Sequence, residues 1–326
     1  MSTNVSERFL RSSLLMKIFT TIHDAKRELD SCVATIGKYD GMHIGHQKIL
    51  DELIEQSRTL SKPSVVILSE PQPDEFFARE TASTRLNHFQ DKVKFLQDYG
   101  INAVYRLKFD YDLSQQTPDD FVRNFLIGGL GVKRLVIGDD FRFGVNRSGN
   151  HELLQKLASE LDYQVITIAP CFNQSERVSS TLVKQYLHAG DCKRVRELLG
   201  RPYSISGKII RGRQLGRQLG APTANVELLV KSLPMTGVFT VIARIKELEF
   251  IGAANMGYNP TIDDSKTPSL EVHLLDFNDD IYGETMQVSF VEKIRNEEKF
   301  ANLDELRTQI FLDIEHARNF FRCVEK

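Results

Sequence analysis

The sequence predicts two domains of different classes, an α/β domain built on a parallel sheet and, after it, a small β-barrel. The chain has 326 residues, more than one domain usually holds. Strand-like and helix-like segments alternate through the first half, as they do in parallel sheets covered by helices. After about residue 200 helical periodicity largely disappears, and short apolar runs separated by Gly, Pro and Asn follow, a pattern typical of a barrel.

In the first domain, apolar runs predict the strands and helical spacing predicts the helices. The expected strands are 32–36, 64–68, 102–109, 134–138 and 163–169. The expected helices are 43–60, 86–99, 118–126 and 151–161. Folds of this class bind ligands at the carboxyl ends of their strands, so loops that follow strands are the first candidates for a site.

Two short helical segments, 180–188 and 192–199, precede the second domain. Its expected strands are 203–210, 238–245, 250–254, 270–275 and 286–291, and its one expected helix is 303–321. We predict a first domain at residues 1–186, a linker helix at 187–200 and a second domain at 201–326. The second domain is then a barrel of antiparallel strands closed by one helix.

Composition excludes several classes of protein. Hydrophobic residues make up 41% of the chain and charged residues 26%, as in globular proteins with a normal core. The formal net charge of -2 gives no global positive field for nucleic acid, although a local basic patch stays possible. Four widely spaced cysteines form no zinc or disulfide pattern, and no apolar stretch approaches the roughly 18 residues of a membrane span. We expect a cytoplasmic protein with no membrane and no nucleic-acid partner, its oligomeric state left open.

The most informative segment of the first domain is TIGKYDGMHIGH, which runs from Thr35 to His46 and joins an expected strand to an expected helix. Its three glycines, Gly37, Gly41 and Gly45, let the backbone approach a ligand closely. A helix start offers N–H groups and partial positive charge to phosphate. His43 and His46 share a face of the first turn and can donate hydrogen bonds to a departing pyrophosphate. Metal ligation and an incidental pair of histidines are the alternatives, but no further Cys/His cluster completes a metal site.

The spacing GxxDGxHxGH resembles the HxGH signature of the nucleotidyltransferase superfamily, in the form used by bacterial FAD synthetases. Three later segments match that family in the same order, Glu70–Phe77, Gly138–Gly144 and Arg177–Lys184. The resemblance implies a Rossmann-like FMN adenylyltransferase domain. It also implies nucleotide and phosphate contacts from Gly37, Asp40, Gly41, Gly45, Arg177, Ser179, Ser180 and Thr181, and flavin contacts from Asp140, Phe141 and Arg142.

The same four residues, His43 to His46, also spell the signature of class I aminoacyl-tRNA synthetases, but the chain has no KMSKS-like loop and no evident tRNA-binding domain. Three positions depart from the FAD synthetase pattern. Lys38-Tyr39 stands where Asn-Phe is frequent, and Ser69 replaces a usual Phe. Lys184 replaces a common Arg and loses the planar fork that binds phosphate bidentately. We expect these departures to affect efficiency more than reaction class.

The second domain carries a glycine-rich basic segment, Gly207–Asn225, whose backbone N–H groups can wrap phosphates, although it lacks the GK[ST] ending of a P-loop. Thr223 and Asn225 supply two neutral oxygens, which suit partial coordination of a Mg²⁺ that is already bound to nucleotide phosphates. Glu271 lies on an expected strand, on the same face as His273. Its carboxylate can accept the proton of an attacking hydroxyl, and a solvated strand residue is the alternative.

From Gly200 to Phe321 the chain resembles riboflavin kinases. The matching segments are Pro222–Asn225, Gly237–Phe239, Asn255–Thr261, Glu271–Phe277, Tyr282-Gly283 and Lys293–Phe300. The resemblance implies a six-stranded antiparallel β-barrel in which Thr223 and Asn225 hold Mg·ATP and Glu271 activates the riboflavin 5′-hydroxyl. It also implies nucleotide contacts from Gly207, Lys208 and Gly216, and flavin contacts from Tyr282, Arg295 and Glu298. Ala221 departs from the family, which usually has Phe there.

Together the two halves predict a bifunctional enzyme that uses ATP and Mg²⁺, with flavin as substrate and product. It would phosphorylate riboflavin to FMN and then adenylylate FMN to FAD, releasing pyrophosphate. One alternative is a single-function nucleotidyltransferase that carries a non-enzymatic barrel. A synthetase-like enzyme acting on RNA is the other.

Overall fold

The computed structural model describes residues 16–78, 84–212, 215–230, 232–260 and 266–324. Contacts divide the chain into two compact units. The first unit comprises Met1–Tyr39, Gly45–Ser83 and Phe89–Pro170, and the second comprises Asp40–Ile44, Thr84–His88 and Cys171–Lys326. No helix within the described ranges is both long enough and apolar enough to cross a bilayer.

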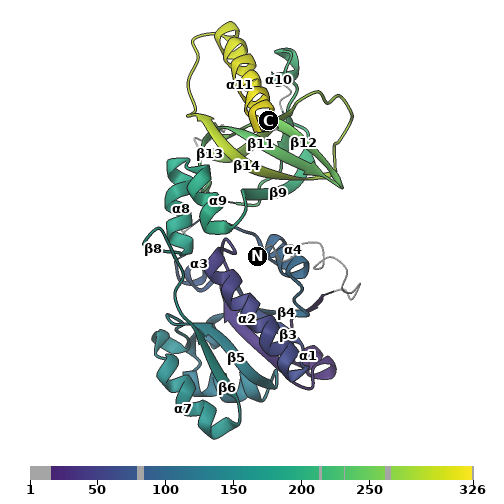
Figure 1. Ribbon diagram of the computed structural model, residues 1–326. Coiled ribbons are helices and arrows are strands. Elements are labelled where there is room, and N and C mark those ends of the chain that lie inside the picture. Colours follow the sequence, from purple (N-terminus) through teal and green to yellow (C-terminus); the bar gives the residue numbers. More distant parts are fainter. Residues whose placement is uncertain (1–15, 79–83, 213–214, 231, 261–265, 325–326) are drawn as a thin grey trace. The chain divides into compact units, whose positions relative to one another are not determined.

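The first unit holds a six-stranded sheet in the order β1-β4-β3-β2-β5-β6, in which every neighbouring pair is parallel (Figure 1). The strands are β1 (Lys17–Phe19), β2 (Cys32–Gly37), β3 (Ser64–Glu70), β4 (Ala103–Lys108), β5 (Val132–Gly138) and β6 (Gln164–Ile168). The predicted parallel α/β class is therefore confirmed. The central strands β2 and β3 are near-continuous apolar runs because helices cover such sheets on both faces.

The helices of the first unit connect these strands. They are α1 (Ile22–Glu28), α2 (Ile44–Leu60), α3 (Pro73–Phe77), α4 (Phe89–Tyr99), α5 (Tyr111–Gln115), α6 (Pro118–Asp120), η2 (Phe121–Ile127), η3 (Val145–Arg147) and α7 (His151–Leu161). The predicted helix 118–126 forms as one turn of α-helix followed by the π-helix η2. Chain order reverses between β2 and β5, which makes the carboxyl ends of these two strands the expected ligand edge of the sheet.

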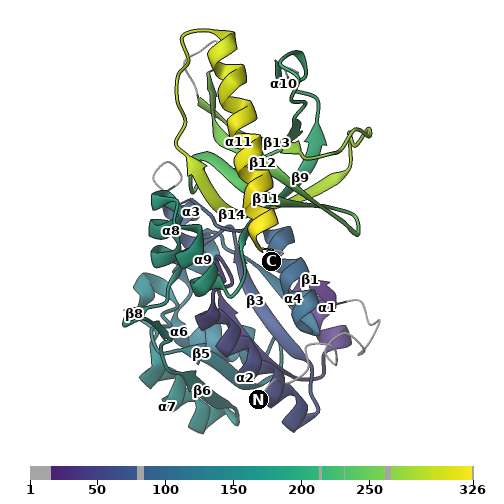
Figure 2. The same cartoon turned by 45° about the horizontal axis from the view of Figure 1, so that its top comes forward.

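The second unit contains a closed antiparallel barrel in the order β10-β13-β12-β11-β14-β9. Its strands are β9 (Tyr203–Ile210), β10 (Ala224–Val226), β11 (Gly237–Ile245), β12 (Leu248–Pro260), β13 (Lys266–Leu274) and β14 (Thr285–Arg295). The six-stranded barrel is confirmed. The helices are α8 (Ser180–Ala189), α9 (Cys192–Leu199), α10 (Leu215–Gln218) and α11 (Leu303–Val324), and a short hairpin pairs β7 (Phe172–Asn173) with β8 (Glu176–Arg177). Helix α11 packs on β11, β12 and β14 (Figure 2).

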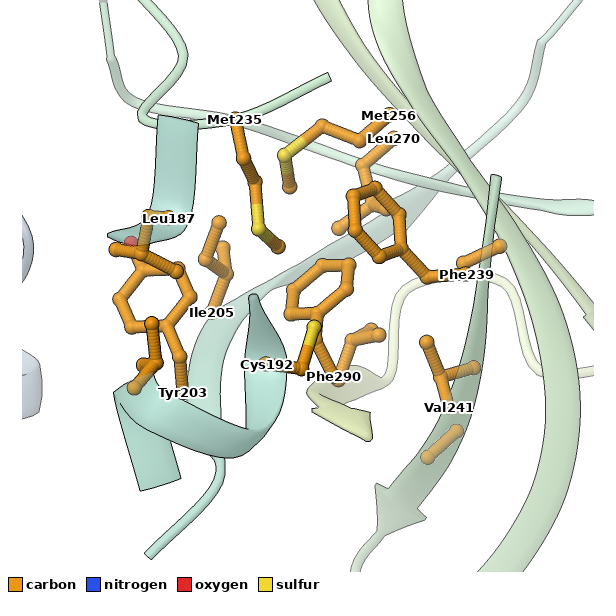
Figure 3. Close-up of a cluster of buried hydrophobic side chains, with 14 of the residues drawn as sticks. Leu187, Cys192, Tyr203, Ile205, Met235, Phe239, Val241, Met256, Leu270 and Phe290 are labelled. Atoms are coloured by element: carbon orange, nitrogen blue, oxygen red, sulfur yellow. The ribbon is translucent and has the colours of Figure 1, made fainter. Parts of the chain in front are cut away.

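The two helices that precede the barrel share its core. Figure 3 shows Leu187 beside Tyr203 and Cys192 beside Phe290, two aromatic residues of the barrel strands, and all four side chains belong to one buried cluster. Each helix has a polar N-cap and a left-handed glycine after its last turn, so both are sharply bounded. Because α8 and α9 cover apolar barrel side chains, we expect the barrel to need them. The boundaries at 186 and 201 stay a prediction about the two sequence domains.

Candidate active sites

The loop between β2 and α2 has an unusual backbone. Tyr39, Gly41 and Met42 lie in the left-handed region, with φ of 48°, 86° and 48°. Only Gly adopts such angles at little cost, so the two other residues need support from their surroundings. Turns that contain left-handed residues can present successive backbone N–H groups to an anion. The predicted helix start at His43 falls one residue later, at Ile44, and phosphate binding by the loop stays a prediction.

Asp40 anchors this loop within the second unit. Its side chain is 3% exposed, and Oδ1 accepts the backbone N–H groups of Leu86 and Asn87 at 2.8 and 3.3 Å. Lys184 Nζ lies 2.9 Å from Oδ2, and Ser180 Oγ donates to the Asp40 carbonyl at 2.7 Å. Lys184, the departure from the family's usual Arg, therefore forms an ion pair with the loop's own carboxylate.

His43 is buried, with 7% of its surface exposed. Burial lowers the pKa of His43 to about 4, the carboxylate of Asp40 opposes this shift, and the positive charge of Arg201 adds to it. The imidazole is therefore neutral at pH 7 and has one N–H to donate. The neutral imidazole can donate a hydrogen bond to a phosphate oxygen, but it brings no positive charge to the site.

His46 lies in the first turn of α2, in the first unit. Its ring packs against Tyr39 with 4.9 Å between ring centroids, and the Tyr39 hydroxyl lies 2.6 Å from Thr35 Oγ1. Burial raises the pKa of Tyr39. The neighbouring departure, Lys38, forms an exposed ion pair with Asp74, while its carbonyl accepts a hydrogen bond from the fully buried Lys92 at 2.7 Å. Tyr39 therefore keeps a supporting aromatic ring under His46.

The segment after β5 lies at the same edge of the sheet as the end of β2, because the two strands are parallel neighbours. Phe141 stacks on Phe143 with 5.5 Å between centroids, and exposed Arg142 donates to the Phe141 carbonyl. Asp140 lies close to Gly138, with Oδ1 3.3 Å from where a Cβ would stand. Asp140, Phe141 and Arg142 are thus brought together at the predicted ligand edge.

Three phenyl rings pack together in the first unit, and two of them end the matched segment Glu70–Phe77. Phe76 and Phe77 of α3 pack edge-on against Phe109 at centroid distances of 5.5 and 5.8 Å. Phe77 is 66% exposed, although its ring is large and apolar. The pair Phe76-Phe77 directly after a strand was the available signal, since exposed neighbouring aromatic rings are candidates for stacking on a flat ligand.

In the Ser-Ser-Thr segment at the start of α8, some residues make structural hydrogen bonds and others are exposed. Ser179 is the N-cap and accepts the N–H of Leu182 at 3.1 Å, while Ser180 bonds the Asp40 carbonyl. Arg177 and Thr181 are exposed. The two serines therefore hold the helix and the loop, and Arg177 and Thr181 are the members of this segment that face solvent.

The barrel brings together Thr223, Asn225 and Glu271. Asn225 on β10 and Asn255 on β12 are both register partners of Glu271 on the intervening strand β13. Thr223 Oγ1 donates to Glu271 Oε2 at 3.3 Å. Register partners point to the same face of a sheet, so the carboxylate lies between two amides. Asn255 was part of a matched segment but had no assigned role; the end of that segment, Thr261, lies outside the described residues.

His273 holds the loop before Thr223. Its Nδ1 lies 2.8 Å from the carbonyl oxygen of Pro222. A carbonyl only accepts, so Nδ1 carries the proton in this contact. Gly212 lies against the Asn225 amide, where a Cβ would come within 2.3 Å of Nδ2. The loop is thus fixed from two sides by contacts that no local sequence pattern reveals.

A cavity of about 520 Å³ adjoins this constellation. Its polar and aromatic lining includes Arg211, Arg217, Thr223, Asp279 and Tyr282. The guanidinium of Arg211 lies 5.4 Å from the Tyr282 ring centroid. Tyr282, which the resemblance assigned to flavin, therefore shares a cavity with the phosphate-loop residue Thr223.

The remaining predicted residues of the barrel have structural contacts. A Cβ on Gly207 would lie 2.2 Å from the carbonyl oxygen of Glu227, and one on Gly216 would lie 2.4 Å from that of Ala221. Lys208 accepts the N–H of Glu227 through its carbonyl. At these two glycines a neighbouring backbone segment lies too close to leave room for a side chain.

Arg295 forms a bidentate pair with Asp313 of α11, with Nε–Oδ1 and Nη2–Oδ2 distances of 2.9 and 2.8 Å. The Asp313 side chain is buried, and the Arg295 guanidinium also lies over the Phe300 ring. Glu298, by contrast, is exposed. Arg295 therefore ties β14 to α11, and its contact with flavin stays a prediction.

Comparison with known proteins finds a matching family for each of the two parts of the chain. A model of the FAD synthetase family matches residues 25–182, and one of the riboflavin kinase family matches residues 199–321. A bifunctional riboflavin kinase/FMN adenylyltransferase of Haemophilus influenzae is 41% identical over 307 residues, 94% of this chain and 99% of the relative. The protein of the same name from Escherichia coli K12 is 40% identical over 308 residues, 94% of this chain and 98% of the relative.

Among solved structures, one from Streptococcus pneumoniae, titled as a macrolide-efflux protein, is 28% identical. It gives a TM-score of 0.79 and covers 94% of this chain and 99% of its own. The likeness extends over both units.

Proposed function

The chain belongs to the family of bifunctional riboflavin kinase/FMN adenylyltransferases, and from this membership we propose how its residues divide the two reactions. The barrel phosphorylates riboflavin, and the loop between β2 and α2 serves the transfer of AMP to FMN. ATP is the phosphoryl donor in the first reaction and the adenylyl donor in the second. A cytoplasmic location and the absence of a nucleic-acid partner stay predictions.

In the kinase reaction, the riboflavin 5′-hydroxyl attacks the γ-phosphorus of ATP, and ADP leaves. Glu271 accepts the hydroxyl proton as the new O–P bond forms. The position of its carboxylate between Asn225 and Asn255, within hydrogen-bonding distance of Thr223, is the observation that carries this assignment. The Thr223 hydroxyl orients the carboxylate through its hydrogen bond.

Mg²⁺ fits the neutral oxygens of this site. Thr223 and Asn225 offer a hydroxyl and an amide oxygen, the hard donors that Mg²⁺ prefers. Within the described ranges no cluster of His, Cys, Asp and Glu side chains could hold a metal by itself, which favours an ion that arrives with the nucleotide. When bound, it neutralises charge on the transferring phosphoryl group. The protein's own part is to hold the phosphates beside Thr223 and exclude other orientations.

In the second reaction, a phosphate oxygen of FMN attacks the α-phosphorus of ATP, and pyrophosphate leaves. His43 and His46 donate hydrogen bonds to the departing group, whose negative charge grows as the bond breaks. The left-handed loop supplies further N–H groups, and the start of α2 adds partial positive charge. No side chain needs to become a covalent nucleophile in this scheme.

Incubation of the purified protein with riboflavin, ATP and Mg²⁺, followed by chromatography of the flavins, tests the proposal. FMN should appear first and FAD second, with pyrophosphate released only during the second conversion. Unchanged riboflavin in the presence of folded protein would overturn the assignment of both sites.

A further inference from the structure

The carbonyl groups of the loop at Gly41 and Met42 bind one guanidinium. Arg201, between α9 and β9, donates from Nη2 to the Gly41 carbonyl and from Nη1 to the Met42 carbonyl, both at 3.1 Å. Nη1 also donates to the carbonyl of Leu199 at 3.1 Å, which fixes the guanidinium to the end of α9. All these residues belong to the second unit. The arginine therefore links the loop to the helix that precedes the barrel.

These contacts determine where the loop's amides point. In a trans peptide the C=O and the following N–H point in opposite directions. Since the Gly41 and Met42 carbonyls both face Arg201, the N–H groups of Met42 and His43 point away from it. The left-handed φ of Met42 (48°) is unfavourable for a residue with a side chain. The guanidinium stabilises that conformation and thereby orients two amides and the histidine that follows.

Arginine is suited to this role by its shape. Its planar fork presents donors in fixed directions to several acceptors at once, which a lysine ammonium cannot reproduce. Burial lowers the pKa of Arg201 to about 10, so the side chain stays charged at neutral pH. A positive charge held behind the loop also favours anions in front of it.

We propose that Arg201 is a positioning residue for adenylyl transfer, which holds the backbone of Gly41 and Met42 so that His43 and the adjacent amides face the pyrophosphate. This inference rests on the proposed role of the β2–α2 loop. Arg201 itself lies inside the segment matched by the riboflavin kinase family, residues 199–321. A residue from the kinase part of the sequence would thus serve the other reaction.

Arg201→Met and Arg201→Lys in the full-length protein test this. Each should lower kcat for FAD formation from FMN and ATP by about 10²-fold, the usual effect of misplacing reacting groups by about 1 Å. The KM for FMN and the phosphorylation of riboflavin should stay unchanged. Guanidinium chloride at non-denaturing concentration should restore part of the lost activity to Arg201→Met. Arg196→Met, which removes an exposed arginine of α9, is the matched control and should retain both activities.

The outcomes separate the possible failures. Normal FAD formation in both Arg201 variants overturns the inference. Equal loss of both activities without guanidinium rescue assigns Arg201 a folding role and also overturns it. His43→Ala, measured in parallel, distinguishes a failure of the loop's proposed function from a failure of the positioning role of Arg201. If His43→Ala makes FAD normally, the proposed function of the loop fails; if only the Arg201 variants are normal, the positioning role fails alone.

Discussion

The two candidate sites differ in whether backbone or side chains carry the proposed role. In the β2–α2 loop the proposed phosphate-binding surface is backbone, with Gly41 and Met42 held in the left-handed region. In the barrel the proposed reacting group is a side chain, Glu271, which is aligned with Asn225 and Asn255 across three neighbouring strands. A strand ladder aligns its side chains through its own hydrogen bonds. A left-handed loop lacks such a ladder and needs contacts with other segments, here those of its Asp40 with Leu86 and of its Gly41 carbonyl with Arg201.

This difference predicts how each site responds to mutation. The barrel site should be sensitive at the reacting side chain and tolerant around it, because the strands keep their register. The loop site should be sensitive also at residues that never touch the substrate. The predictions below test this contrast, beginning with the largest expected effect.

Glu271→Gln should have the largest effect. Gln keeps the shape of Glu and much of its hydrogen bonding to Thr223, but it cannot take the hydroxyl proton. Loss of a general base should lower riboflavin phosphorylation by about 10²–10⁴-fold. Conversion of supplied FMN to FAD should not change. Both half-reactions are measured on one preparation; near-normal phosphorylation contradicts the base assignment, and equal loss of both reactions points to misfolding.

His46→Ala should give the opposite phenotype. It removes a donor to the departing pyrophosphate and should lower adenylyl transfer by about 10²–10³-fold. FMN should accumulate from riboflavin while FAD formation slows. Tyr39→Phe, which keeps the ring beside His46 and removes only the hydroxyl that contacts Thr35, is the control and should act mildly. Unaltered FAD synthesis by folded His46→Ala would show that this imidazole takes no part.

The fold was largely predictable, because hydrophobic periodicity is local. The alternation of segments predicted the parallel sheet, and its loss after Gly200 predicted the barrel. Among the described residues four strands were missed: β1 and β10 have three residues each and β7 and β8 have two, too few to show a period. The π-helix η2 was also missed, since widening of a helix depends on its packing and leaves the apolar spacing almost unchanged.

The candidate sites were predictable only where one motif holds the residues. Thr223 and Asn225 were found within one glycine-rich segment and Glu271 on an expected strand, and the structure brings them together. Arg201 was not found, because 159 positions separate it from Met42. Arg295 was assigned to flavin by resemblance, whereas its long-range partner Asp313 gives it a structural contact. Contacts between distant segments require coordinates.

Arg295→Met tests how much the pair with Asp313 contributes to the stability of the barrel. The change leaves the Asp313 carboxylate, 4% exposed, without its bidentate partner. Removing one member of a buried pair should lower the free energy of unfolding of the barrel by about 3 kcal/mol. The double variant Arg295→Met with Asp313→Leu should recover most of this loss, because no charge stays buried. Urea denaturation followed by circular dichroism measures both.

The same variants separate packing from flavin contact. If Arg295 only ties β14 to α11, the double variant should regain a normal KM for riboflavin along with its stability. A raised KM that persists in the stable double variant would instead support direct contact with flavin. A double variant as unstable as the single one would show that apolar side chains cannot replace the pair at this position.

The smallest predicted effect concerns the acid sensitivity that the loop acquires by burying His43. The ordinary pKa of this group is 6.5, and burial lowers it to about 4 in the folded protein. Above pH 6.5 both folded and unfolded chains carry a neutral imidazole, so the group leaves stability unchanged. As the pH falls below 6.5 the unfolded chain binds a proton that the folded chain does not, and unfolding becomes more favourable. Between pH 7 and pH 5 this linkage should cost about 2 kcal/mol.

Urea denaturation of the second unit at pH 7 and pH 5 measures this loss. Between pH 7 and pH 5 the free energy of unfolding should fall by about 2 kcal/mol more in the wild-type protein than in His43→Asn, which lacks a group that titrates in this range. His188→Asn removes an exposed histidine of α8 and should behave like the wild type. An equal decrease in wild type and His43→Asn would show that the imidazole is hydrated in the free protein. The loop would then be open before nucleotide binds, and its anchors would act only in the complex.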